Sequence, residues 1–391
     1  MSSSPTYHAV PVSDIPSSAT TIAPIKRGRS MLAALMLAIC VVSFVLQTEL
    51  AQYVQRTTNF SKPYFILYIS HCCYVFMAPV QFIGEMIARY KSPSKGLVEL
   101  AKDTARECKL ELEQSLEDLQ HQVVGSNDNS KLSRLRFSVR TVILLAVLLT
   151  IPSYSWYVSV NLTSMANLTA IYNTGCLFAY LFSILMLGDK LVLTKVIAVF
   201  LCVTGVFTMA FWPSDVSDGQ DKASDGSVDD DDSNRSYAVS VLGIAVAALA
   251  AASYGFYEVY YKKYASPPRP SVLFANAVTT GIGITTILLL WIPIPIFHWM
   301  GHETFQVPDL RTFMYILGIA SMSVVYNATF MCVIALVNPV FAAVGVMLTV
   351  PAVAITDVLV TGVMTPLSTI VGSIFILIGF YILNRQVKAT Q

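Results

Sequence analysis

The chain has 391 residues, of which 55% are hydrophobic and 13% are charged, and its formal net charge is +1. Because soluble domains carry roughly 25% charged residues, this composition excludes an ordinary soluble protein. The balanced charge gives no reason to expect a nucleic-acid partner.

Residues 1–30 are rich in Ser, Thr and Pro, which predicts a disordered N-terminus. Ten apolar segments follow, each about 20 residues long and so able to cross the roughly 30 Å core of a bilayer. A backbone in lipid must satisfy its own hydrogen bonds, so these segments are predicted to be helices. The fold class is therefore an all-α polytopic membrane protein with ten transmembrane helices. The segments are residues 31–51, 63–88, 138–160, 164–187, 191–211, 238–261, 271–296, 311–333, 338–360 and 366–384.

A polar insertion, residues 89–136, follows the second apolar segment. Within it, apolar residues recur at steps of three and four over residues 94–123, which predicts an amphipathic helix. Such a helix could lie on the membrane surface, cover the rest of the molecule or pair with a partner helix. We favour a solvated helix that packs on its own protein.

A second polar stretch, residues 212–237, holds eight Asp residues and predicts a flexible acidic loop. Its spacing lacks the closing Glu of an EF-hand, so no calcium site is predicted. Asn59 and Asn234 begin glycosylation sequons, and both lie close to the lipid. Residues 386–391 are predicted to form a short tail.

Two hydrophobic hairpins carry the same glycine spacing. Gly205 follows Gly188 by 17 residues, and Gly379 follows Gly362 by the same interval. This predicts a duplicated unit of five helices, with one half over residues 31–211 and the other over residues 238–385. Since five is an odd number, the second half enters the membrane from the opposite side. Inverted repeats of this kind typically enclose a central site that is reached alternately from two sides.

The basic residues predict the orientation. If the N-terminus is cytosolic, the cytosolic segments hold 20 Lys and Arg residues and the opposite side holds five, which together are all 25 in the chain. This asymmetry obeys the positive-inside rule and predicts that both termini are cytosolic. It also leaves no basic residue for the membrane interior.

Four acidic residues fall inside predicted helices, namely Glu49, Glu85, Glu258 and Asp357. A charge inside a membrane is costly, so each one is a candidate for function. Simpler interpretations stand beside this one. Glu49, Glu85 and Asp357 lie near helix ends where they could reach water, and Glu258 could pair with Lys262 one turn later.

Polar and aromatic residues inside the helices complete the candidate substrate site. Asn side chains can instead bond neighbouring helices, and His71, alone among aromatic residues, is interpreted as a core histidine with satisfied hydrogen bonds. No catalytic residue, metal site or cofactor is predicted. The candidate substrate-binding residues are Glu49, Tyr172, Asn173, Tyr254, Glu258, Asn276, Tyr326, Asn327 and Asp357.

The fourth apolar segment carries a run that resembles a known family. It reads Asn-Leu-Thr-Ser-Met-Ala-Asn-Leu-Thr-Ala-Ile-Tyr-Asn-Thr-Gly-Cys-Leu-Phe from residue 161, and Leu-Met-Leu-Gly-Asp-Lys from residue 185. Asn-Pro-Val from residue 338 and Leu-Thr-Val-Pro from residue 348 add to the likeness. These motifs resemble the drug/metabolite transporter superfamily, in particular the F-type branch of solute-carrier family 35 and its fungal relatives.

The resemblance extends over about residues 30–385 and departs from the branch pattern at two places. Gly175-Cys176 stands where the branch has Ser-Ser, and Asp189 stands in place of Glu. The family implies ten helices in two EamA-like halves and the transport of a small organic solute. It is also consistent with a multi-pass protein of an endomembrane, vacuolar or Golgi-type, and leaves a homodimer open.

The nature of the solute follows from the interior charges. Nucleotide sugars need Lys or Arg to hold their phosphates, and the predicted interior holds neither. Interior acids together with Tyr254, Tyr257, Tyr260 and Tyr261 suit a cation better, through ion pairing and cation–π contacts. We therefore predict a secondary transporter for a cationic or zwitterionic metabolite, of which thiamine is an example.

Two alternatives remain open, namely a nucleotide-sugar antiporter and a membrane receptor or scaffold that does not transport. An enzyme is not predicted, because the five His residues form no set with a nucleophile or a metal cluster. The chain also has no Gly-Lys-Ser/Thr loop for ATP-driven pumping.

Overall fold

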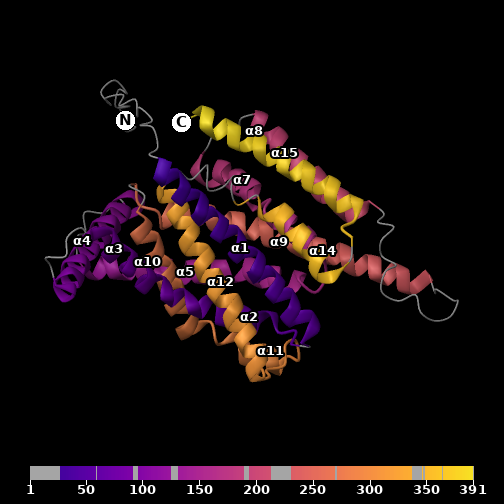
Figure 1. The fold of residues 1–391 in the computed structure, drawn as a ribbon, viewed down its shortest axis with the longest axis horizontal. Coiled ribbons are helices and arrows are strands. Elements are labelled where there is room, and N and C mark those ends of the chain that lie inside the picture. The colour runs from indigo at the N-terminus through magenta and orange to yellow at the C-terminus, as the bar shows by residue number, and fades with distance from the viewer. Residues whose placement is uncertain are drawn as a thin grey trace, which may run out of the picture.

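The computed structural model describes residues 27–58, 60–90, 96–124, 131–188, 193–212, 230–268, 271–336, 346, 348–362 and 364–390. Each regular element in these parts of the chain is a helix (Figure 1). The elements are α1 Arg27–Thr57, α2 Pro63–Cys72, the 3-10 helix η1 Cys73–Phe76, α3 Met77–Arg89, α4 Leu97–Val124, α5 Lys131–Ser159, α6 Met165–Tyr172, α7 Gly175–Leu187, α8 Leu193–Phe211, α9 Asp230–Tyr264, α10 Val272–Leu289, α11 Pro293–Trp299, α12 Leu310–Leu336, α14 Thr349–Thr361 and α15 Leu367–Thr390.

Seven of the described segments are long and apolar enough to cross a membrane. Three shorter apolar helices, Val196–Thr208, Thr349–Val360 and Leu367–Gly379, lie within the fifth, ninth and tenth predicted segments. The chain is thus a polytopic membrane protein. That ten of its helices cross the membrane stays a prediction. Large apolar side chains such as Phe200, Leu185 and Leu359 are exposed, as expected of a surface that faces lipid.

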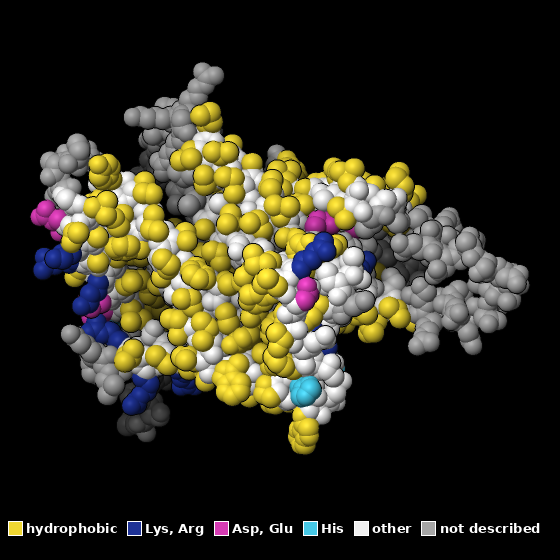
Figure 2. All heavy atoms as spheres, turned by 60° about the horizontal axis from the view of Figure 1, so that its bottom comes forward, with side chains coloured by type: hydrophobic (Ala, Val, Ile, Leu, Met, Phe, Trp, Pro, Cys, Tyr) yellow, Lys and Arg dark blue, Asp and Glu magenta, His cyan; other side chains and the backbone are white. Residues whose placement is uncertain are grey.

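Figure 2 shows such a surface, on which hydrophobic side chains cover a broad area. Lys and Arg side chains gather mainly along one edge of this face, on the side where α3 and α4 lie in Figure 1.

Three predicted segments are interrupted. In the seventh, α10 ends at Leu289 and α11 begins at Pro293. In the second, η1 separates α2 from α3, and a 3-10 turn within a helix often marks a functional site. In the fourth, α6 ends at Tyr172 and α7 begins at Gly175. At this break the Asn173 amide donates to Thr169 O at 2.8 Å and the Thr174 hydroxyl donates to Ile171 O at 2.6 Å. Side chains that bond the local backbone in this way compete with a continuous helix.

The helices pack mainly in pairs that are distant in sequence. Figure 1 shows α1 beside α12 and α8 beside α15, and α9 packs against both α5 and α7. The main hydrophobic core joins residues of α1, α2, α5 and α6 to residues of α9, α12 and α14. These pairings bring the two predicted halves together around a shared centre.

The predicted glycine pairs lie at equivalent places. Gly188 and Gly362 end α7 and α14 in the left-handed conformation, with φ of 73° and 71°. A Cβ on Gly205 of α8 would lie 2.6 Å from Gly372 O of α15, and one on Gly379 of α15 would lie 2.7 Å from Ala198 O of α8. Glycine is therefore needed for the close approach of these helices. Such reciprocal contacts are expected of two related hairpins, and the inverted repeat remains our interpretation of them.

The predicted amphipathic helix of the insertion is present as α4. Its apolar residues Leu112, Leu116 and Leu119 pack with residues of α5 and α10, and Figure 1 shows it beside α3 and α10. Polar contacts tie it to the same elements, since Arg89 pairs with Glu107 and Ser271 donates to Glu111 at 2.6 Å. In the structure, α4 packs on its own protein.

Several predictions fall on segments at the edge of the described residues. Residues 1–26, Asn59 and residues 213–229 lie outside them, so the disorder of residues 1–26, one sequon and most of the acidic loop stay predictions. The prediction of disorder is wrong for residues 27–30, because α1 begins at Arg27. The last part of the predicted loop is helical, because α9 begins at Asp230. Acidic residues suit this position, since negative charge stabilises a helix N-terminus. Most of the predicted tail is helical too, because α15 ends at Thr390.

Candidate functional site

A cavity of about 290 Å³ lies where α1, α2, α5, α9 and α12 meet the α6–α7 break. Its lining is unusually aromatic, and Glu258 is the one acidic side chain among the lining residues that the structure describes. None of those lining residues is a Lys or an Arg. The aromatic lining is formed by Phe44, Tyr74, Trp156, Tyr157, Tyr172, Tyr254, Tyr257, Tyr326 and Phe330, and the polar lining includes Gln47, Ser70, His71, Ser153, Asn173, Thr279, Ser323 and Asn327.

Helix α9 brings the central residues of the cavity onto one face. Tyr254, Tyr257 and Glu258 are three and four positions apart, so their side chains share a side of the helix. Gly255 lies between them and packs against the start of α7, where a Cβ would lie 2.6 Å from Gly175 O and from Ala179 N. Because α9 can approach so closely, Tyr254 meets Tyr172 of α6 with ring centroids 5.2 Å apart.

The Glu258 carboxylate lies among phenol rings. It lines the cavity together with Tyr172, Tyr254 and Tyr326, and the Tyr254 and Tyr257 rings stack with centroids 5.9 Å apart. Glu258 makes no ion pair with Lys262, so the local pair considered from sequence is absent. No hydrogen bond to the carboxylate comes from the described part of the chain. An acid among aromatic faces is suited to bind a cation.

The structure brings six of the nine predicted site residues together at this cavity. Asn276 lies outside it, because its amide donates to Gln81 of α3 at 2.5 Å. Glu49 and Asp357 lie outside it as well, between α1 and α14. Gln52 donates to Asp357 at 3.4 Å. The residues that line the cavity are Tyr172, Asn173, Tyr254, Glu258, Tyr326 and Asn327.

The remaining acidic candidates differ in their surroundings. Glu85 accepts a hydrogen bond from Gln81 at 3.0 Å and pairs with Arg89 at 3.3 Å along the same helix, which agrees with a solvated helix end. The Glu49 carboxylate is buried, and neither of its oxygens has a hydrogen-bond partner.

His71 is not the satisfied core histidine that its sequence context indicated. It lines the cavity, is 3% exposed, and its Nδ1 is buried with no hydrogen-bond partner. Its ring stacks on Tyr74 with centroids 5.1 Å apart. Sequence reasoning also missed Trp156 and Tyr157, which enter the cavity from α5. Their position one turn after Pro152, in the middle of a predicted helix, was the available signal.

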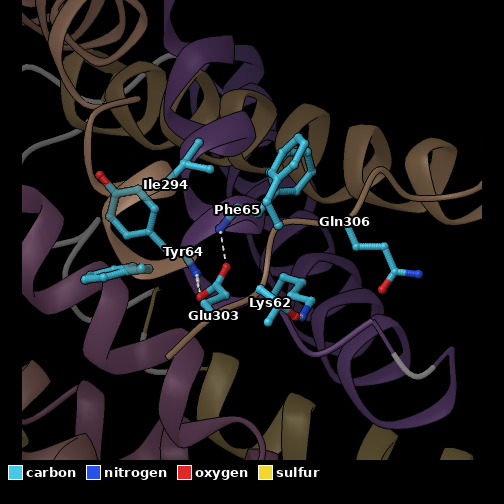
Figure 3. A pocket seen from close by; sticks show the side chains of 9 residues that line it. Lys62, Tyr64, Phe65, Ile294, Glu303 and Gln306 are labelled. Atoms are coloured by element: carbon cyan, nitrogen blue, oxygen red, sulfur yellow. Dashed lines mark hydrogen bonds between the residues drawn. The ribbon is translucent and has the colours of Figure 1, made fainter. Parts of the chain in front are cut away.

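A network of contacts joins the start of α2 to the segment before α12, at the predicted outer end (Figure 3). The Glu303 carboxylate accepts hydrogen bonds from the backbone N–H groups of Tyr64 and Phe65, both at 3.0 Å, at the start of α2. Burial raises the pKa of this carboxyl, and the two N–H donors and Lys62 oppose that shift. The pocket beside it measures about 10 Å³, room for one water at most. It is therefore a closed contact and not a solute site.

A second closure joins α1 to the segment after α5. The Arg56 guanidinium donates to Val160 O and Thr163 O, with the shorter bonds at 2.6 Å. Asn161 of the same segment donates to Gln55 at 3.1 Å and to Ser61 at 2.8 Å. These bonds hold the predicted outer ends of the first and third segments together.

Comparisons with known proteins agree with this architecture. Residues 123–211 match the EamA-like transporter family. An uncharacterized transporter of Schizosaccharomyces pombe, C405.03c, is 24% identical and aligns over 91% of this chain and 96% of its own length. The thiamine-repressible mitochondrial transport protein THI74 of Saccharomyces cerevisiae is 22% identical, over 91% of this chain and 92% of its own.

A third relative is the uncharacterized vacuolar membrane protein YML018C of Saccharomyces cerevisiae, 22% identical over 92% of this chain and 91% of its own. One solved structure, described as "Crystal structure of protein", is 11% identical to this chain and has a TM-score of 0.44. The match covers 90% of this chain and 98% of the solved chain. The family match over residues 123–211 and the three relatives support assignment of the chain to the drug/metabolite transporter superfamily, and they point to a multi-pass membrane transporter and not an enzyme.

Proposed function

We propose that this transporter carries a small organic cation or zwitterion by alternating access to the central cavity. The observation that carries the proposal is the Glu258 carboxylate among tyrosine rings, in a cavity whose described lining has no basic residue. Inside a membrane an uncompensated acid is costly. A cationic solute would supply the missing countercharge, and the rings would add cation–π attraction.

The same observation disfavours a nucleotide sugar as the solute. A diphosphate is held best by Arg or Lys, which form strong charge-assisted hydrogen bonds with its oxygens. The described lining offers it one carboxylate instead, which would repel it. The volume of about 290 Å³ also lies just below the usual range of ligand pockets, about 300–1,000 Å³, and so favours a small metabolite.

The closed contacts around Glu303 and Arg56 support a transport cycle with alternating openings. In our interpretation they shut the predicted outer side, so that the solute enters from the cytosolic side in this state. The name of one relative, a vacuolar membrane protein, agrees with our assignment to an endomembrane, whereas another relative is named as mitochondrial. The cytosolic placement of both termini rests on the basic residues alone.

Uptake into vesicles that contain the purified protein tests the proposal. The panel holds thiamine, choline and 1-methylnicotinamide as organic cations, and UDP- and GDP-sugars as the rival class. Thiamine is included because the name of one relative refers to it. We expect saturable uptake of at least one cation and none of the nucleotide sugars. Uptake of the sugars alone would contradict the proposal, and no uptake of any compound would favour a receptor or scaffold.

Asn173 gives a second test, at the α6–α7 break. Replacing it with Leu is expected to weaken the affinity for the transported cation about tenfold, or about 1.4 kcal/mol. The reason is that a polar group at the cavity wall is lost. The variant also loses a hydrogen bond to Thr169 O, and stability should fall by about 0.5–1.5 kcal/mol. Binding and thermal unfolding are both measured.

Thr150→Val is the matched control, because Thr150 donates to Ala146 O at 2.8 Å and does not line the cavity. It should lose similar stability and keep its affinity. If Asn173→Leu also keeps its affinity, Asn173 is a packing residue.

A further inference from the structure

The imidazole of His71 differs from its polar neighbours Ser70 and Tyr74 in its hydrogen bonding. A neutral imidazole has one donor and one acceptor nitrogen, and neither finds a hydrogen-bond partner in the described part of the chain. Native structures leave few buried polar atoms unsatisfied, and each exception needs an explanation. The residue is 3% exposed and lines the cavity, so water or a solute in the cavity would supply the missing bond.

The neighbouring polar side chains do not share this feature. Ser70 donates to Ile66 O at 2.9 Å and contacts the Tyr157 hydroxyl at 3.2 Å. The Tyr74 hydroxyl pairs with Ser323 at 3.4 Å. These groups satisfy one another, and the imidazole is left out of their network.

The backbone that carries His71 is held firmly in place. The residue lies at the end of α2, immediately before η1. A Cβ on Gly283 of α10 would lie 2.7 Å from Val75 N and 3.2 Å from His71 O, so α10 presses directly on this turn. Stacking on Tyr74 then restrains the ring. A ring on a firmly held backbone and without a hydrogen-bond partner has the character of a preorganised binding group.

The cavity thus has two separate polar groups. Glu258 projects from α9 among Tyr172, Tyr254 and Tyr326, whereas His71 projects from α2 and stacks on Tyr74. One group is an anion that suits a positive charge, and the other is a hydrogen-bonding ring. A solute that satisfies both must carry two different functional groups.

We propose that His71 is a substrate-binding residue that hydrogen-bonds a polar group of the solute while Glu258 binds its positive charge. This inference rests on the proposed function and narrows it. The substrate class becomes an organic cation with a separate hydrogen-bonding group, such as an amide, amine or hydroxyl. Rotation of the ring about its Cβ–Cγ bond can present either nitrogen to the solute.

A pair of probes isolates the contribution of the polar group. 1-Methylnicotinamide and 1-methylpyridinium are both flat aromatic cations, and only the first carries a carboxamide. We expect the wild-type protein to take up 1-methylnicotinamide at least tenfold more efficiently, as kcat/KM. In His71→Leu this ratio should fall towards one, because the uptake of 1-methylnicotinamide falls and the uptake of 1-methylpyridinium does not. His71→Gln, which keeps a donor and an acceptor, should retain part of the preference.

Thermal unfolding without a probe separates binding from packing. Because His71→Leu removes a buried polar group that had no partner, its stability should be unchanged or higher. If His71→Leu keeps the uptake ratio of the wild-type protein, the inference is overturned, whether or not the stability of the variant changes. Should His71→Leu fail to fold, an uptake ratio of about one in His71→Gln supports the inference, and a wild-type ratio overturns it.

The two proposals can fail separately. If uptake of both probes depends on Glu258 and the wild-type protein shows no preference between them, only the His71 inference is wrong. If the wild-type protein takes up neither these probes nor the other cations, the proposed function is wrong and the inference fails with it.

Discussion

Replacing Glu258 with Gln is expected to lower the uptake of an organic cation by about a hundredfold or more. The variant keeps the shape of the side chain and removes the countercharge that we propose for the bound solute. Leaving a desolvated charge without its partner costs about 3–5 kcal/mol, and each 1.4 kcal/mol is a factor of ten in affinity. Initial rates in vesicles at several concentrations measure the effect.

Glu258→Asp and Glu85→Gln serve as matched controls. The first keeps the charge and should retain part of the uptake. The second makes the same chemical change at Glu85, which pairs with Arg89 on α3 away from the cavity, and should leave uptake near the wild-type rate. Normal uptake by Glu258→Gln, with Glu258→Asp also normal, would mean that the carboxylate does not contact the solute.

Replacing Gly205 with Ala is expected to destabilise the protein by about 1–3 kcal/mol, the usual cost of forcing a methyl group into a close-packed contact. Its new Cβ would meet Gly372 O at 2.6 Å and Ile376 at 2.9 Å. Gly379→Ala should act in the same direction, because the reciprocal Cβ would meet Cys202 and Ala198 O. Thermal unfolding in detergent measures both variants.

Gly84→Ala on α3 is the control, since no atom lies within 4 Å of a Cβ at that position. Alanine is the better helix former by about 0.5–1 kcal/mol, so this variant should be as stable as the wild type or more stable. Equal shifts at Gly84, Gly205 and Gly379 would show that α8 and α15 are not closely packed in the protein.

Features that depend on local pattern could be predicted from the sequence. The amphipathic period over residues 94–123 correctly indicated α4, and the apolar segments correspond to the described helices. Tyr254, Tyr257 and Glu258 were found because their helical spacing can be read from the sequence. An acidic residue within an apolar segment is also rare and therefore easy to recognise. Gly188 and Gly362 were found because each precedes another glycine by 17 residues in a hydrophobic hairpin. The structure shows that both end a helix with positive φ, a conformation that favours glycine.

Features that depend on contacts between distant helices could not be predicted. Asn276 has the same chemistry as Asn173, and only its contact with Gln81 removes it from the cavity. The break after Tyr172 lies in a continuously apolar segment, where the bonds of Asn173 and Thr174 to the local backbone decide the outcome. For His71 the sequence shows aromatic neighbours, but whether a ring nitrogen has a partner depends on several helices at once.

The hydrogen bonds of Glu303 have an energetic consequence for the proposed cycle. Pro63 at the start of α2 has no N–H, and Glu303 accepts from the next two donors, those of Tyr64 and Phe65. Because Glu303 precedes α12, separating α12 from α2 would leave these donors to water and return the carboxylate to solvent. The two hydrogen bonds favour the form that is shut at this end, and the desolvation that raises the pKa of the Glu303 carboxyl opposes them. In the proposed cycle, a bound solute would have to offset the loss of these two hydrogen bonds before it could leave on that side.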